Sequence, residues 1–284
     1  MNNIVEMTKT TYGFALRQAE QMLADADVPN AALDAEYLLE HLTGWNRARQ
    51  FMEKDRIMEK DLYERYIALA KERAKRIPLQ HIIGTQEFMG LEFEVNEHVL
   101  VPRQDTEVLV EHALKILKDG DSVLDLCTGS GCILLSLMKL GPLLNGTGGD
   151  ISKDALEVAN RNKEKLGVNA KFVETDLFSK ITKKYDLITS NPPYIPTGII
   201  PGLMPEVREH DPYIALDGKE DGLWFYERIT EEAPKHLYRG GYLMYEIGVD
   251  QGEAVSAMLE RAGFKDIRVE KDYSGNDRVV IGHL

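Results

Sequence analysis

The sequence predicts an α/β protein: a mostly parallel sheet with an antiparallel terminal strand, preceded by a small helical domain and a β-hairpin connector. Three observations predict it. From Ser122 onward, short apolar runs alternate with stretches of helical period, which is typical of a parallel sheet covered by helices on both faces. Before residue 78, apolar residues recur at helical spacing. Between these regions lie two short β-rich runs with glycines at their bends.

Residues 1–77 are predicted to form the helical N-terminal domain. Its helices are expected at residues 11–24, 30–43 and 60–76, where each has one apolar face. Gly44 supplies the stop of the second helix.

The third of these helices ends in basic residues, namely Lys71, Arg73, Lys75 and Arg76. Cations complement the negative end of a helix dipole, and this structural role is the favoured interpretation. The alternative is a docking patch for an acidic partner or for RNA.

Residues 78–101 are expected to connect the two domains. Pro78 ends the preceding helix, and residues 81–84 and 88–95 are predicted to pair as strands. The second domain, residues 102–284, then opens with a helix capped by Asp105 or Thr106. Arg103, just before this cap, is either structural or faces the active cleft.

A glycine turn follows the first strand of the second domain. Residues 123–126 run into this turn and a helix follows it, so that backbone N–H groups can approach a ligand at a helix N-terminus. The candidate cofactor-binding residues of the turn are Cys127, Thr128, Gly129, Ser130 and Gly131.

Acidic residues end the next two strands. Asp150 lies where such a residue can bond both ribose hydroxyls of an adenosine, although it could also simply lead a helix. Asp176 can accept a hydrogen bond from an adenine amino group while Leu177 covers the ring, and a turn aspartate is the equally plain alternative.

The fourth strand, residues 185–190, ends in Asn191, Pro192, Pro193 and Tyr194. The two prolines stiffen the backbone and fix the direction of the Pro192 carbonyl. That carbonyl and the Asn191 side-chain oxygen can each accept one N–H of a planar NH2 group, whose lone pair then faces an electrophile, while the Tyr194 ring stacks on the group. Ordinary turn chemistry is the alternative.

These candidates share one position, the carboxyl ends of successive strands, where open α/β sheets bind ligands. Residues 195–218 form a long, proline-containing loop that could wall the substrate. Further elements are expected as a helix at 223–237, a strand at 241–248, a helix at 251–262 and a hairpin of 264–270 with 278–281. Glu246 falls at the end of its strand and is a further candidate site residue.

Composition narrows the function classes. The net charge of −13 argues against broad nucleic-acid binding, which requires clustered positive charge. No apolar run is long enough for a membrane span, and the first residues lack the pattern of a secretory signal. With only Cys127 and Cys132, no metal site is expected, and a reducing cytoplasm is the simplest location.

These residues resemble those of class I, Rossmann-like S-adenosylmethionine-dependent methyltransferases, in which Asn-Pro-Pro-Tyr is the amino-methyltransferase motif. The resemblance extends over nearly the whole chain to the release factor glutamine methyltransferases (PrmC/HemK). It rests on residues 78–84, 87–91, 101–107, 191–195 and 272–278.

The resemblance implies methylation of N5 of the glutamine in the Gly-Gly-Gln loop of peptide chain release factors. S-adenosylmethionine would be the donor and S-adenosylhomocysteine the product. It implies a cofactor cradle at 127–131, ribose binding by Asp150, the adenine edge near Asp176 and Leu177, and a glutamine held by residues 191–194. The helical domain would help to bind the release factor, and we expect a monomer without sequence-specific nucleic-acid binding.

One residue departs from the family pattern: the first glycine of the cofactor loop is Cys127 here. A positive φ at this position would be costly for cysteine. Two other functions remain open, an adenine-N6 methyltransferase of DNA or RNA and a cofactor-binding module without catalysis.

Overall fold

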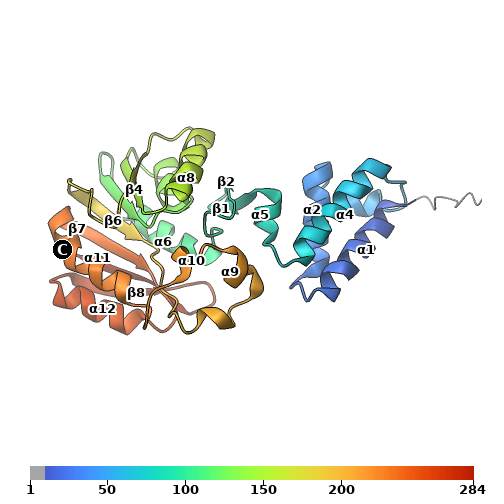
Figure 1. Cartoon of the computed structure of the whole chain (residues 1–284). Coiled ribbons are helices and arrows are strands. Elements are labelled where there is room, and N and C mark those ends of the chain that lie inside the picture. Colours follow the sequence, from blue (N-terminus) through green and yellow to red (C-terminus); the bar gives the residue numbers. More distant parts are fainter. Residues whose placement is uncertain (1–9) are drawn as a thin grey trace, which may run out of the picture. The chain divides into compact units, whose positions relative to one another are not determined.

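The computed structural model describes residues 10–284, which fall into two compact units, one ending at Gly84 and one spanning Thr85–Leu284 (Figure 1). Each unit buries hydrophobic residues of its own. Within residues 10–284, no helix is both long and apolar enough to cross a bilayer.

The first unit is helical, with α1 Tyr12–Asp25, α2 Ala31–Thr43, α3 Arg47–Met52, α4 Lys60–Ala74 and α5 Leu79–Ile83. The three predicted helices are confirmed as α1, α2 and α4. The Thr11 hydroxyl caps α1 by accepting a hydrogen bond from the Phe14 N–H, and Gly44 ends α2 in the left-handed conformation. Helix α3 was missed because six residues show too little periodicity.

The strand predicted at residues 81–84 is wrong, because this segment belongs to the one-turn helix α5. Pro78 precedes that helix, and Gly84 ends it with φ +80°. A short apolar run does not distinguish a strand from a helical turn, and here the flanking proline and glycine decide.

One cation at the basic end of α4 has a structural role. Arg73 is buried, and its Nε donates to Asp34 Oδ2 on α2 at 2.7 Å. Lys75 pairs with Glu72 on the same helix, at 2.7 Å. For these two residues the contacts favour the structural interpretation over a docking patch.

The second unit contains the sheet and its helices. Its elements are β1 Thr85–Phe88, β2 Leu91–Glu94, α6 Gln104–Leu114, β3 Ser122–Leu126, α7 Cys132–Leu140, β4 Asn145–Asp150, α8 Lys153–Leu166, β5 Lys171–Glu174, β6 Tyr185–Ser190, the 3-10 turn η1 Ile200–Gly202, α9 Pro205–His210, α10 Tyr213–Leu216, α11 Trp224–His236, β7 Leu237–Glu246, α12 Gly252–Arg261, β8 Lys265–Lys271 and β9 Asp277–His283.

Seven strands form one sheet in the order β5-β4-β3-β6-β7-β9-β8. The strands from β5 to β7 are parallel, and β9 is antiparallel to both of its neighbours. This confirms the predicted mostly parallel sheet with an antiparallel strand near the chain end. Strands β1 and β2 form a separate antiparallel hairpin.

Helices cover both faces of the sheet. Residues of α6 and α7 pack on one face, and residues of α11 and α12 pack on the other. In β3, Val123 joins the first layer and Leu124 the second, as the alternation of side chains along a strand requires.

The order of the strands locates a ligand site. From β3 the chain continues outward to β4 and β5, then returns to pair β6 with the other side of β3. The sheet therefore has a switch point at β3, and ligands are expected beyond the carboxyl ends of β3, β4 and β6.

Two predicted boundaries need correction. Helix α6 begins at Gln104, with Arg103 as its N-cap residue, so Asp105 and Thr106 lie in its first turn and do not cap it. The segment 195–218, predicted as a loop, contains η1, α9 and α10. Each is at most two turns long, too short to show periodicity in the sequence.

Candidate active site

The turn after β3 has the backbone conformation of a ligand cradle. Cys127, Gly129 and Gly131 all have positive φ, at 57°, 54° and 79°. A Cβ on Gly131 would approach Leu135 and Phe172 side-chain atoms to 3.1 Å, whereas one on Gly129 would meet nothing within 4 Å. The positive φ of Cys127 strains its backbone, as the sequence analysis anticipated. The empty space beside Gly129 leaves room for a ligand.

A buried carboxyl fastens this turn to the sheet. Asp125 of β3 accepts hydrogen bonds from the hydroxyls of Thr128 at 2.6 Å and of Thr189 on β6 at 2.8 Å. Burial raises the pKa of Asp125 to about 7 against the opposing effect of these two bonds. Thr128, predicted as a cofactor residue, lines the pocket, but its hydroxyl is turned to Asp125, its backbone N–H donates to the Gly149 carbonyl at 3.1 Å and its carbonyl accepts from the Gly131 N–H at 2.8 Å.

Asp150 joins the end of β4 to the same turn. Its Oδ2 accepts from the Gly129 N–H and its Oδ1 from the Ser152 N–H, both at 2.9 Å. The carboxylate lines the pocket, and burial raises its pKa above the ordinary value. Each oxygen keeps a lone pair, so the carboxylate can still accept from ligand hydroxyls.

Asp176 and Leu177 follow β5 and also line the pocket. Both oxygens of Asp176 pair with the Arg228 guanidinium, at 3.1 and 3.3 Å, so this carboxylate is engaged before any ligand arrives. The guanidinium carbon also lies 4.6 Å from the Trp224 ring centroid. The sequence pattern did not reveal that Arg228 and Trp224 pack beside Asp176, because α11 lies about fifty residues downstream of Asp176.

A single pocket of the second unit brings these groups together. Its walls include residues 127–130 of the turn, Asp150 and Asp176, and the apolar residues Leu177, Trp224 and Phe225; Gly131, also predicted for the cradle, does not line it. Apolar walls with a few convergent polar groups are typical of small-molecule sites.

Asn191 lies directly after β6 and lines this pocket together with Pro193. Its Nδ2 donates to the hydroxyl of Thr106 on α6 at 3.5 Å, which leaves Oδ1 free to accept from a ligand. Pro192 is buried, as expected for a stiff corner packed against the sheet.

Tyr194, the last residue of this corner, makes its contacts with the protein interior. Tyr194 is not one of the described residues that line the pocket. Its hydroxyl donates to Glu246 Oε1 at 3.5 Å. Burial and the nearby Glu246 charge raise the pKa of the Tyr194 hydroxyl. The arrangement therefore gives no evidence for the ring stacking suggested by the sequence.

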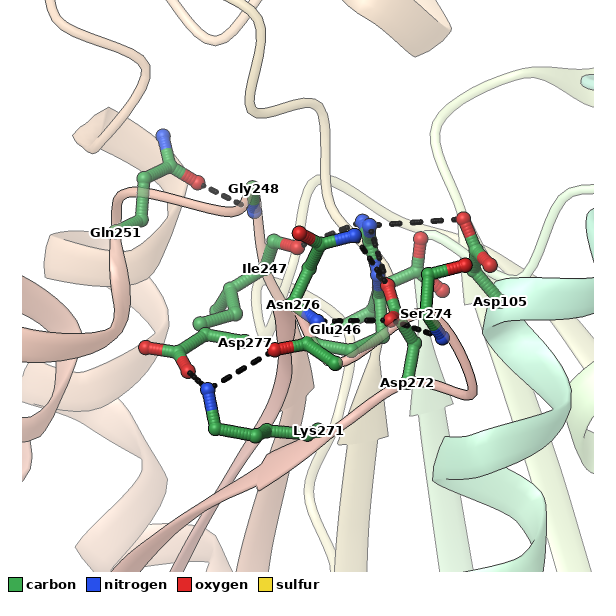
Figure 2. Close-up of polar contacts among 12 residues, drawn as sticks. Asp105, Glu246, Ile247, Gly248, Gln251, Lys271, Asp272, Ser274, Asn276 and Asp277 are labelled. Carbon is green, nitrogen blue, oxygen red and sulfur yellow. Dashed lines mark hydrogen bonds and ion pairs between the residues drawn. The ribbon is translucent and has the colours of Figure 1, made fainter.

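Sequence reasoning missed Gln251, a buried amide at the start of α12. Its Nε2 donates to the carbonyls of Tyr194 at 3.1 Å and Gly222 at 3.3 Å. Its Oε1 accepts from the Gly248 N–H at 2.9 Å, the contact that Figure 2 shows. Three loops thus meet at one side chain. No sequence pattern reveals such a contact, because its partners are distant in the chain.

A second polar cluster lies beside Glu246 (Figure 2). The buried Arg278 of β9 donates to Asp272 Oδ2 at 3.1 Å and to the Ile247 carbonyl at 3.1 Å, and its NH2 group lies 3.5 Å from Asp105. Asp272 in turn accepts from the N–H groups of Ser274 and Asn276. The segment 272–278 therefore braces the loop after β7.

Arg103, which the sequence left undecided, lines the pocket. It also pairs with the buried Asp211 at 3.0 Å, which links the start of α6 to the segment between β6 and α11. Burial raises the pKa of Asp211 to about 6, even though the Arg103 charge acts to lower it.

Comparison with known proteins agrees with this geometry. Residues 15–84 match the family model of the PrmC N-terminal domain, and residues 103–198 match that of the methyltransferase small domain. A solved methyltransferase from Pyrococcus furiosus, 19% identical, superposes with a TM-score of 0.55 over 75% of this chain and 98% of its own. At that identity the likeness concerns the fold alone.

The fold and the site define a methyltransferase with a Rossmann-like sheet. A release factor glutamine methyltransferase of Geobacter sulfurreducens is 44% identical over 92% of this chain and 93% of its own length. One of Agrobacterium fabrum is 40% identical over 95% and 96%. The chain belongs to the release factor glutamine methyltransferase family.

Proposed function

We propose that this chain methylates N5 of the glutamine in the Gly-Gly-Gln loop of a peptide chain release factor, with S-adenosylmethionine as donor. The observation that supports this most is that Asn191 lines the same pocket as the glycine turn and Asp150. An amide acceptor in the pocket that could hold the methyl donor suits the transfer of a methyl group to a planar NH2.

The residues present fit the donor. The open side of Gly129, the carboxylate of Asp150 and the apolar Leu177 and Trp224 suit the cradle, ribose and base of an adenosine. When bound, S-adenosylmethionine supplies an electrophilic methyl group and leaves as S-adenosylhomocysteine. Asp176 pairs with Arg228, whose guanidinium lies over the Trp224 ring, and these residues would flank the base.

The chain's own contribution is to hold the substrate amide. A glutamine nitrogen is a poor nucleophile because its lone pair is delocalised into the carbonyl. Asn191 Oδ1 and the Pro192 carbonyl would each accept one N–H, which favours a pyramidal nitrogen in the transition state. Pro193 keeps the corner stiff, and Tyr194 anchors it through its carbonyl and hydroxyl.

The first unit would contribute to recognition of the release factor, and the catalytic unit would act in the cytoplasm as a monomer. The net charge of −13 supports a protein partner over a nucleic acid. The match of residues 15–84 to the family model of the PrmC N-terminal domain supports treating this segment as a unit with a role of its own.

The test is a labelled-methyl transfer assay with three acceptors: a release factor, DNA, and buffer alone. We expect label only on the release factor, and mass mapping of its peptides should locate the methyl group on the Gly-Gly-Gln glutamine. A release factor with that glutamine changed to alanine is the matched control. Label on DNA would favour the adenine-N6 alternative, and no label on any acceptor would favour a binding module.

A further inference from the structure

The side-chain amide of Gln251 is buried at a point where three loops meet. Gln251 is 7% exposed and is the N-cap residue of α12. Its Nε2 donates to the Tyr194 carbonyl at 3.1 Å and to the Gly222 carbonyl at 3.3 Å. Its Oε1 accepts from the Gly248 N–H at 2.9 Å. Both ends of the amide are therefore bonded within the second unit.

These partners allow the amide only one orientation. The carbonyls of Tyr194 and Gly222 can only accept hydrogen bonds, and the Gly248 N–H can only donate one. A rotated amide would set oxygen against oxygen at both carbonyls and would leave the Gly248 N–H facing a nitrogen. The NH2 group of Gln251 therefore holds together two carbonyls from segments that are distant in the sequence.

The backbone of Tyr194 packs closely at this point. A Cβ on Gly218 would lie 2.7 Å from Tyr194 Cα, and one on Gly222 would lie 2.8 Å from Gln251 Nε2. Gly222 also has φ +78°, a conformation that favours glycine. The two glycines therefore permit the approach of main chain and amide that the hydrogen bonds require.

Both carbonyls lie next to residues of the pocket. Asn191, which lines the pocket, comes three residues before Tyr194. The two prolines between them have fixed φ angles, so the position of the Tyr194 backbone determines that of Asn191. Trp224, the first residue of α11, lines the same pocket and comes two residues after Gly222. Gln251 thus joins the corner that would hold the substrate amide to the start of α11.

We propose that Gln251 is a positioning residue for methyl transfer, whose NH2 group holds the Asn191–Tyr194 corner against the start of α11. Gln251 is not among the described residues that line the pocket, so it acts through the Tyr194 and Gly222 carbonyls. The proposal rests on the proposed function, because alignment matters for a transfer between two bound groups. A misplacement of about 1 Å can slow such a reaction about a hundredfold.

Two variants separate the two ends of the Gln251 amide. Gln251→Met has a similar length but makes none of the three hydrogen bonds. Gln251→Glu keeps an oxygen for the Gly248 N–H and sets its other oxygen against the two carbonyls. Both should lower the single-turnover rate of methyl transfer to a release factor about tenfold or more, at saturating donor and acceptor. A Gln251→Glu rate close to wild type would overturn the proposal, because the contact with Gly248 would then suffice.

Coupling to Asn191 distinguishes positioning from a general loss of stability. Gln251→Met combined with Asn191→Ala should react within about twofold of Asn191→Ala alone, because both changes disable the same corner. Losses that multiply in the double variant would contradict an action through Asn191. Glu253→Gln, an exposed change in the first turn of α12, is the matched control and should react at the wild-type rate.

Donor affinity provides a second distinction. Asp150 and the glycine turn are held by their own hydrogen bonds, so the affinity of Gln251→Met for S-adenosylhomocysteine should stay within about threefold of wild type in calorimetry. A loss of affinity as large as the loss of rate would show that the whole pocket had been disturbed, and would overturn the proposal.

Hydrogen exchange without substrate separates this proposal from the proposed function. Just after Tyr194, the Ile195 N–H donates to the Leu216 carbonyl at 3.1 Å and the Thr197 N–H to the Lys219 carbonyl at 2.8 Å. In Gln251→Met these two amides should exchange about tenfold faster or more, while the amides of β3 keep their wild-type rates. That result would support the contact even if no release factor were methylated. Equal exchange in the variant and in wild type would overturn it.

Discussion

Asp150 accepts hydrogen bonds from two backbone N–H groups of neighbouring loops, and it lines the pocket. Asp150→Ala should weaken the binding of S-adenosylmethionine by about 1.5–3 kcal/mol, the range for hydrogen bonds to a charged group. Calorimetric titration measures this directly. Asp154→Ala, an exposed change in the first turn of α8, is the control and should bind normally. Unaltered affinity in Asp150→Ala would reject its role at the ribose.

Asp125 should make stability depend on pH. Its folded-state pKa of about 7 lies above the ordinary value near 4, so between these values the folded protein keeps a proton that the unfolded chain has lost. The free energy of unfolding must then fall as pH rises from about 4 to 7. Asp125→Asn cannot ionise, so its Tm should fall less steeply over this window than that of wild type. Equal slopes in calorimetric scans would contradict the assigned pKa.

Residue types at strand ends carried most of the site prediction. Asn191, Asp150 and residues 127–130 of the turn were all found from spacing and line the pocket, whereas Gly131 does not line it. The partners that orient them were not found, because Thr106, Gln251 and Arg228 come from helices far away in the sequence. Local patterns reveal which groups could act, whereas their orientation depends on tertiary contacts.

The glycines of strand β4 give its sequence a low strand propensity, but close packing around the strand explains why glycine is needed there. A Cβ on Gly148 would lie 2.6 Å from two ring carbons of Phe172 and 3.0 Å from Thr128 Oγ1. Gly148→Ala should therefore destabilise the protein by about 1–3 kcal/mol, the usual cost of overpacking.

Denaturant unfolding at constant pH measures that cost. Gly198→Ala is the matched control, because a Cβ there meets nothing within 4 Å and the residue lies in an exposed loop. It should unfold at nearly the wild-type midpoint. If the Gly148 and Gly198 variants unfold together, close packing does not explain the glycines of β4.

The elements themselves were predicted unequally. Long helices such as α1 and α4 were found because several turns repeat the same apolar face. The short α3, α5, α9 and α10 were missed or mistaken, because fewer than two full turns carry no period. The antiparallel β9 was predicted only as half of a terminal hairpin, and its insertion between β7 and β8 depends on tertiary pairing.

At the scale of the molecule, the two units have separate hydrophobic cores. The fragment Thr85–Leu284 should therefore fold alone and bind S-adenosylmethionine within about twofold of the full chain. It should methylate a short Gly-Gly-Gln peptide normally, but with a release factor its KM should rise about tenfold or more, since surface for the partner is lost. An unchanged KM would contradict a recognition role for the first unit.

The central claim is that the Asn191 corner grips the substrate amide. It is tested most directly by the single-turnover rate of methyl transfer to a release factor in Asn191→Ala, at saturating donor and acceptor. The rate should fall about a hundredfold or more, the scale for losing one preorganised polar contact, with donor affinity unchanged. Asn145→Ala is the control: Asn145 begins β4, at the end of the strand away from Asp150 and the pocket, so this variant should react at the wild-type rate. An Asn191→Ala rate close to wild type would contradict the claim.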